Sequence, residues 1–236
     1  MGREPTMSRT GRIGGVVAAA LALVPAGCAK APTSPRPSDT AATAWVSCEY
    51  TVTGGAAKVA DPPSGAQVPT TGTATVTLTM AAGTLTVTLD RSAAPCAVHS
   101  FESLAAQGYY TGTSCHRLTN AGIRILQCGD PSGTGEGTSG YGLTPETNSP
   151  LVTCANEART ECSYPAGLVV LADPEHDGGQ FFMTYAESQI SGDYPVLGTI
   201  DEAGQQVLTQ IAEKGFKQGA SPAPAADTTL RQVTLG

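Results

Sequence analysis

Charged residues are scarce in this chain of 236 residues, at 14%, and Lys and Arg number only 13 against 20 Asp and Glu. The resulting formal charge of −7 argues against a nucleic-acid-binding role, because binding to phosphates requires a basic surface. Aromatic residues are few as well, at 5%, whereas there are 28 Gly and 17 Pro. This composition favours one turn-rich β domain with tails over a helical bundle.

The motifs of metal and nucleophilic catalysis are also missing. The chain has three histidines, but no H-E-x-x-H, close C-x2-C pair or G-x-S-x-G elbow. The glycine run "GDPSGTGEG" lacks the Gly-Lys-Ser/Thr of a phosphate-binding loop, and no helical pattern follows it. We interpret this run as a packing loop that needs positive φ angles. The sequence therefore predicts no metal site and no cofactor.

The apolar run "VVAAALALVPAGC" is too short to span a bilayer, and three arginines precede it. This is the pattern of a secretory signal, with Met1 or Met7 as the start. Because "VPAGC" resembles a bacterial lipoprotein cleavage box, we predict that residues 1–28 are a lipoprotein signal peptide ending at a lipidated Cys28. The lipid would anchor the protein to the outer face of the cell membrane; ordinary secretion is the alternative.

The rest of the chain divides by composition. Residues 29–44, rich in Pro, Ser, Thr and Ala, are predicted to be a disordered tether. Residues 45–73 are predicted to form an extended arm, and residues 74–236 the compact domain.

Six further cysteines form an even number, which in an exported protein indicates disulfides. Six cysteines allow many connectivities, so the sequence does not settle the pairing. Our working assignment is Cys115–Cys128 across a hairpin, Cys154–Cys162 within a loop, and Cys48–Cys96 for the remaining two.

Hydrophobic periodicity gives a coarse secondary structure. Apolar residues alternate through 76–80 and 85–89, which predicts a hairpin, and then recur at helical spacing through 95–108 and again through 201–215. Pro95 suits a helix start, and Gly108 and Gly215 suit helix ends. Short apolar runs lie between the helices and a final strand closes the chain. This order predicts a mainly β protein, an antiparallel barrel capped by two helices.

Two further motifs carry a resemblance. "CHRL…LQCGDPSGTGEG" from Cys115 is similar to the cyclophilin signature Phe-His-Arg-(apolar)…Gln-Gly-Gly-Asp-(Pro)-x-Gly-Thr-Gly, and "GGQFFMTY" from Gly178 resembles its Gly-Ser-Gln-Phe-Phe segment. "GLVVLAD" and "YPVLGTI" also match, in order, within residues 74–236. The resemblance implies a closed eight-stranded antiparallel β-barrel capped by two α-helices, and peptidyl-prolyl cis–trans isomerase activity. The cysteines and the lipid anchor resemble an extracytoplasmic bacterial branch of this family.

The resemblance also implies the site. Arg117 would stabilise the twisted imide, because rotation makes the proline nitrogen pyramidal and basic and a nearby cation then favours that state. Gln127 and Gln180 would hold the substrate backbone, and Phe182 would form the floor of the proline pocket. No covalent bond breaks, so the reaction requires no cofactor. Further substrate-binding residues implied by the resemblance are Ile125, Ala172, Asp173, Ile190 and Tyr194.

The segment "TNAGIRILQ" departs from the family pattern, because it is two residues longer than usual. The family's pocket phenylalanine has no clean counterpart, and either Ile123 or Arg124 falls at its place. Two hypotheses follow. The first is a monomeric isomerase acting on proline-containing segments of exported client proteins. The alternative is a catalytically weak peptide-binding or chaperone module on the same barrel.

Overall fold

The computed structural model describes residues 44–218 and 222–236. The predicted signal peptide 1–28 with Cys28, and the predicted tether 29–44 except for its last residue, lie outside the described residues. Within the described ranges, none of the helices combines the length and apolar character needed to cross a membrane.

The predicted hairpin is confirmed as β4 (Thr73–Met80) and β5 (Gly83–Asp90). Leu78 pairs directly with Leu85 across the two strands. Buried and more exposed residues alternate along both strands, because every second side chain points into the core. The residues buried on that side are Val76, Leu78, Met80, Leu85, Val87 and Leu89.

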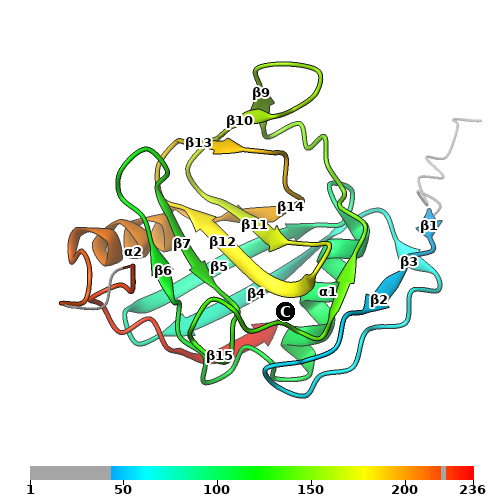
Figure 1. Ribbon diagram of the computed structural model, residues 1–236, viewed down its shortest axis with the longest axis horizontal. Coiled ribbons are helices and arrows are strands. Elements are labelled where there is room, and N and C mark those ends of the chain that lie inside the picture. Colours follow the sequence, from blue (N-terminus) through cyan, green and yellow to red (C-terminus); the bar gives the residue numbers. More distant parts are fainter. Residues whose placement is uncertain (1–43, 219–221) are drawn as a thin grey trace, which may run out of the picture. The chain divides into compact units, whose positions relative to one another are not determined.

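The main sheet has eight antiparallel strands in the order β15–β4–β5–β14–β11–β12–β7–β6 and curls around a core (Figure 1). Its other strands are β6 (Arg117–Leu118), β7 (Ile125–Cys128), β11 (Leu168–Asp173), β12 (Asp177–Thr184), β14 (Val196–Ile200) and β15 (Leu230–Leu235).

The predicted closure of the barrel is wrong: the sheet is an open, curled half-barrel, and no ladder joins β6 to β15 among the described residues. Single hydrogen bonds span the gap instead, such as Leu118 N–H to the carbonyl of Pro222 at 2.7 Å. The reason is local, since β6 has only two residues and Pro222, whose carbonyl accepts from Leu118, has no N–H to donate back to a ladder.

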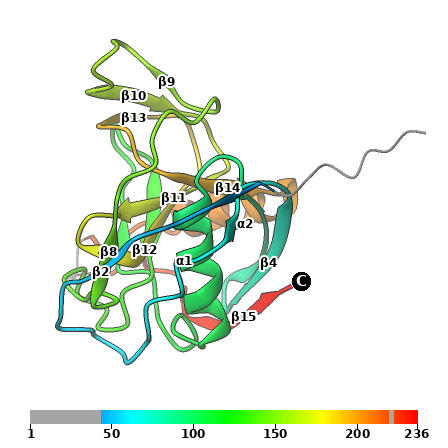
Figure 2. The ribbon, with the colours of Figure 1, turned by 90° about the vertical axis from the view of Figure 1, so that its right-hand side faces the viewer.

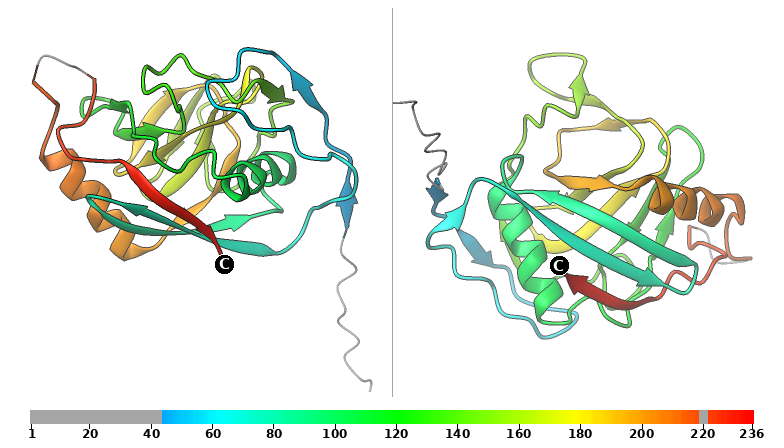
Figure 3. Two further views of the ribbon diagram at one scale, coloured as in Figure 1. Left: turned by 90° about the horizontal axis from the view of Figure 1, so that it is seen from below. Right: turned by 180° about the vertical axis from the view of Figure 1, so that it is seen from behind.

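The two predicted helices are confirmed as α1 (Pro95–Ala106) and α2 (Glu202–Glu213), which lie on either side of the β4–β5 hairpin (Figure 3). Pro95 occupies the first turn of α1, where its missing N–H costs nothing. Asp201 caps α2 by accepting a hydrogen bond from Gly204 N–H at 2.8 Å. Helix α1 packs against β12 and β15, and α2 packs against β5.

The arm contributes three short strands, β1 (Trp45–Val46), β2 (Tyr50–Val52) and β3 (Val68–Pro69). Strand β1 pairs with β3. Strand β2 pairs with β8 (Tyr141–Leu143), which lies beside it in Figure 2. The Cys48–Cys96 disulfide ties the arm to the first turn of α1. The other two pairs of the working assignment, Cys115–Cys128 and Cys154–Cys162, are also present.

A second, smaller sheet stands beyond the main one, at the top of Figure 1. It has the order β13–β10–β9 and consists of β9 (Thr153–Cys154), β10 (Glu161–Tyr164) and β13 (Ser188–Ser191). Because Cys154 and Cys162 pair across β9 and β10, the disulfide closes this hairpin near its tip.

Candidate active site

The register of three neighbouring strands aligns the predicted catalytic residues. Arg117 of β6 lies directly opposite Gln127 of β7, and Gln127 lies directly opposite Phe182 of β12. Directly opposed residues share one face of a sheet. Adjacent strands are about 4.8 Å apart, so the backbones at Arg117 and Phe182, two strands apart, are separated by about 10 Å. A cation, an amide and an aromatic ring therefore face the same side.

That side of the sheet carries its own apolar cluster, separate from the main core. Phe181 belongs to the main core, whereas Phe182 belongs to this second cluster, as strand alternation requires. Phe182 is only 4% exposed, and the rings of Tyr164 and Tyr194 meet it edge-on at centroid distances of 6.1 and 6.0 Å. The predicted residues gathered here are Ile125, Phe182 and Ile190, with Ala172 and Tyr194 half-buried at the border.

The two residues predicted for the altered wall, Ile123 and Arg124, have different surroundings. Ile123 packs against the second cluster, whereas Arg124 is exposed and its guanidinium reaches the carbonyl of Glu187. Of the two residues predicted for this wall, the aliphatic one is thus the one that contacts the cluster.

A chain of hydrogen bonds orients the polar residues. Arg117 Nη1 donates to Gln127 Oε1 at 3.2 Å, and Gln127 Nε2 donates to Gln180 Oε1 at 2.9 Å. Gln180 Nε2 donates in turn to the carbonyls of Gly135 and Gly137, at 3.1 and 2.9 Å. Because a carbonyl can only accept, the amide of Gln180 has one orientation, which then fixes the amide of Gln127.

The loop that supplies those carbonyls is organised by Asp130, which sequence reasoning missed. Its buried carboxylate accepts from the backbone N–H groups of Ser132, Thr134 and Gly135, at 2.7, 3.1 and 2.7 Å. Burial acts to raise the pKa of Asp130, but the hydrogen bonds from Ser132, Gly135 and Gly137 outweigh it and hold the pKa below its usual value. The available signal was an Asp followed two residues later by a Ser, typical of an Asx turn.

Glycine is required in this loop at the point nearest that carboxylate. A Cβ on Gly137 would stand 2.0 Å from Asp130 Oδ1. The glycine run is therefore more than packing, because it lets the backbone close around Asp130 and present two carbonyls to Gln180.

A second missed carboxylate, Asp177, fixes the backbone under Gln180. It is buried and accepts from the N–H groups of Ser139, Gly179 and Gln180, at 2.8, 2.8 and 2.9 Å. Burial raises its pKa, and these hydrogen bonds offset the effect only in part. Asp177 and Asp130 thus hold the strand and the loop on either side of the same glutamine.

Asp173 is the predicted site residue that joins neither the apolar cluster nor the chain of hydrogen bonds. It is exposed at the end of β11, where its carboxylate lies 3.0 Å from His176 Nδ1. This hydrogen bond raises the pKa of His176. Ala172 beside it does border the second cluster.

Among the described residues, one group of side chains has metal-ligand spacing: Cys154, Cys162 and Asp193. Its two sulfur atoms are joined in a disulfide, so they offer no thiolates to a metal ion.

Comparisons with known proteins identify the family of the chain. Residues 75–235 match the family model described as cyclophilin type peptidyl-prolyl cis-trans isomerase/CLD. The chain is 36% identical over 204 residues to a probable peptidyl-prolyl cis-trans isomerase B of Mycobacterium leprae, covering 80% of this chain and 67% of that protein. It is 37% identical over 158 residues to the Mycobacterium tuberculosis protein of the same name, covering 65% of this chain but only 51% of the relative.

The fold has solved counterparts as well. A cyclophilin-type peptidyl-prolyl cis-trans isomerase of Cryptosporidium parvum, crystallised in the presence of the dipeptide Ala-Pro, superposes with a TM-score of 0.56. The identity is 25%, and the match covers 69% of this chain and 98% of that one. The chain therefore belongs to the cyclophilin-type peptidyl-prolyl cis-trans isomerase family.

Proposed function

We propose that this protein is a peptidyl-prolyl cis–trans isomerase in which Arg117 stabilises the twisted imide. The observation that supports it most is the row of Arg117, Gln127 and Phe182, which places a cation and an apolar ring on one face of the sheet. The relatives are named as isomerases, and the C. parvum structure obtained with Ala-Pro supports a proline-containing ligand.

The mechanism follows from the amide bond. Its rotation barrier is about 18–20 kcal/mol because the nitrogen lone pair is delocalised into the carbonyl. With the proline ring against Phe182, rotation would localise the lone pair on nitrogen, where the Arg117 guanidinium can donate to it. A guanidinium stays charged when half-buried. If the guanidinium stabilises the twisted state relative to the planar states by about 1.4 kcal/mol, the rate of isomerisation rises about tenfold.

The chain of hydrogen bonds orients the guanidinium of Arg117. One guanidinium nitrogen, Nη1, is engaged by Gln127, which leaves other N–H groups of Arg117 for the substrate. Gln127 is held by Gln180 and Gln180 by two backbone carbonyls, so the guanidinium is oriented before substrate binds.

The test is an isomerisation assay on a short X–Pro peptide with Arg117→Ala. We expect kcat/KM to fall by roughly 100-fold or more, since the lost interaction acts mainly on the transition state. Arg124→Ala is the matched control, because Arg124 is an exposed arginine on the same segment, and it should leave kcat/KM unchanged. If Arg117→Ala were as active as the wild type, the proposed role of this residue would be wrong.

A second candidate is a peptide-binding or chaperone module with weak turnover, favoured by Ile123 in place of an aromatic wall. It predicts that the wild type binds X–Pro peptides but does not measurably accelerate their isomerisation. The same assay, combined with a peptide-binding titration, separates the two functions.

We also propose that the protein acts outside the cytoplasm, on proline-containing segments of exported proteins, as a monomer anchored through Cys28. The three disulfides support an oxidising compartment, and the sequence around Cys28 supports lipidation. Cys28→Ser should move the protein from the membrane fraction to the soluble exported fraction. Equal membrane association of both forms would contradict the lipid anchor.

A further inference from the structure

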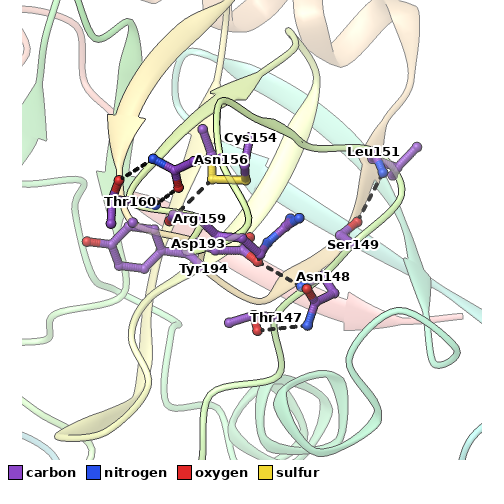
Figure 4. A network of polar contacts seen from close by, with 12 residues as sticks. Thr147, Asn148, Ser149, Leu151, Cys154, Asn156, Arg159, Thr160, Asp193 and Tyr194 are labelled. Atoms are coloured by element: carbon purple, nitrogen blue, oxygen red, sulfur yellow. Dashed lines mark hydrogen bonds and ion pairs between the residues drawn. A yellow bond between two sulfur atoms is a disulfide. The ribbon is translucent and has the colours of Figure 1, made fainter.

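The β9–β10 hairpin is attached to the short loop 192–194 by a shielded ion pair (Figure 4). Arg159 Nε donates to Asp193 Oδ2, and the same oxygen accepts the backbone N–H of Asn148 at 2.7 Å. The Asp193 side chain is only 4% exposed. A carboxylate this buried needs its cation, because removing Arg159 leaves a largely shielded charge without its counter-ion.

The backbone of the same loop is bonded to the hairpin on both sides of Asp193. Gly192 N–H donates to the carbonyl of Thr160 at 2.9 Å. The hydroxyl of Tyr164, at the end of β10, accepts the N–H of Tyr194 at 2.7 Å and donates to the carbonyl of Gly192 at 3.3 Å. Every residue of loop 192–194 is therefore held by the hairpin.

This loop carries a side wall of the apolar cluster around Phe182. Tyr194 meets the Phe182 ring edge-on, at an interplanar angle of 83°, and Tyr164 meets it from another side at 68°. The hairpin thus supplies one aromatic neighbour of Phe182 and positions the other. It makes none of the contacts that orient Arg117, which come from β7, β12 and the glycine loop.

The backbone at Arg159 is held in an unfavourable conformation. Its φ is +51°, in the left-handed region that non-glycine residues seldom adopt. Such outliers persist where the surrounding structure enforces them. Here the Cys154–Cys162 disulfide brackets Arg159, so the cross-link keeps the guanidinium aimed at Asp193.

We propose that Arg159 and Asp193 are positioning residues for substrate recognition: together with the Cys154–Cys162 disulfide they form a clamp that fixes Tyr194 against the proline pocket and so sets the affinity for X–Pro substrates. The proposal rests on the proposed function and names a part of the same site. Because the clamp acts on the pocket wall and not on Arg117, it controls KM and leaves kcat nearly unchanged.

The first test compares Arg159→Gln and Arg159→Lys in the X–Pro assay. We expect Arg159→Gln to raise KM by about tenfold with kcat within about twofold, and Arg159→Lys to recover most of the affinity. Arg91→Gln is the matched control, since Arg91 forms the other partly buried Arg–carboxylate pair of the described chain, with Glu102 at 2.6 Å. It should lower the melting temperature without changing KM.

The second test uses the cross-link, because the double variant Cys154→Ser with Cys162→Ser should also raise KM. The corresponding change at Cys48 and Cys96, a disulfide outside this sheet, should not. Unchanged KM in both Arg159→Gln and the Cys154/Cys162 variant, with only lower melting temperatures, would overturn the clamp.

The two proposals fail in different ways. A wild type that binds the X–Pro peptide without turnover refutes the isomerase function alone, and the clamp is then decided by whether Arg159→Gln raises the peptide Kd by about tenfold. A wild type that neither binds nor isomerises the peptide refutes both. Loss of kcat with unchanged KM in Arg159→Gln refutes the clamp alone.

Discussion

Gln180→Glu is the substitution that most directly tests the hydrogen-bond chain of the site. The two side chains have nearly the same shape, but the change replaces the NH2 group that donates to the carbonyls of Gly135 and Gly137 with an oxygen. Gln180 is 6% exposed, so water has little room to compensate. A carboxylate there would face two carbonyl oxygens.

The magnitude follows from the two hydrogen bonds that the substitution removes. Each contributes about 1 kcal/mol, and a poorly solvated carboxylate opposite two acceptors adds roughly 1–2 kcal/mol. We therefore expect the free energy of unfolding to fall by about 3–4 kcal/mol near neutral pH. When protonated, the new carboxyl can donate to one carbonyl, so the destabilisation at low pH should shrink to about 1 kcal/mol.

The sign of the pH dependence is fixed by the same hydrogen bonds. The folded site favours the neutral carboxyl, so its pKa lies above the value of about 4.3 in the unfolded chain. The folded state then binds the proton more tightly, and the destabilisation grows as the pH rises above about 4.3.

Urea unfolding of Gln180→Glu and wild type at about pH 4 and about pH 7.5 measures the difference. Gln189→Glu is the control, because Gln189 is exposed on β13, and it should change stability by less than about 0.5 kcal/mol at either pH. A Gln180→Glu penalty equal at both pH values would mean that the amide is oriented the other way, and the chain from the glycine loop to Arg117 would be refuted.

Two further predictions concern the same region. Gly129→Ala should lower the free energy of unfolding, measured in urea, by roughly 3 kcal/mol. The reason is that φ is +94° and the new Cβ would lie 2.5 Å from the carbonyl oxygen of Gly179. Gly133→Ala is the control: φ is +72° but the space around it is open, so it should lower that free energy by only about 1 kcal/mol. Burial lowers the pKa of His116 despite the opposing charge of Asp130, so the folded state holds this ring neutral and stability should fall as the pH drops below 6.5. His116→Gln should flatten the unfolding free energy over that range, and a slope equal to that of the wild type would exclude His116 as its source.

Much of the fold was predictable from local pattern, because local physics determines it. The alternation through β4 and β5 and the helical spacing of apolar residues in α1 indicate which side chains are buried. The two strands and the helix formed as predicted. Closure of the barrel was not predictable in this way. It depends on whether β6 and the segment before β15 can form a ladder, and a two-residue strand bonded to a proline does not provide one.

The candidate site was also predictable only in part. The positions of Arg117, Gln127 and Phe182 came from motif resemblance, and the register explains their row. The roles of Asp130 and Asp177 were missed, because most of their partners are backbone N–H groups: the Asx pattern at Asp130 indicates a turn but not its bond to Gly135, and no residue pattern displays the bonds of Asp177. Ile123 and Arg124 could not be separated either, since an inserted segment shifts the count and only packing shows which one turns inward.

The missed residues explain how a chain so poor in charge orients its one proposed catalytic cation. Arg117 has no carboxylate partner in the chain of hydrogen bonds that holds it; a neutral amide, Gln127, takes that place. A carboxylate there would raise the cost of directing the guanidinium at a weakly basic nitrogen, because it would compete for the same charge. The two carboxylates, Asp130 and Asp177, are instead set one step back, where each is occupied by backbone N–H groups. They fix the two ends of Gln180, so that in the proposed mechanism the positive charge of Arg117 stays available to the substrate.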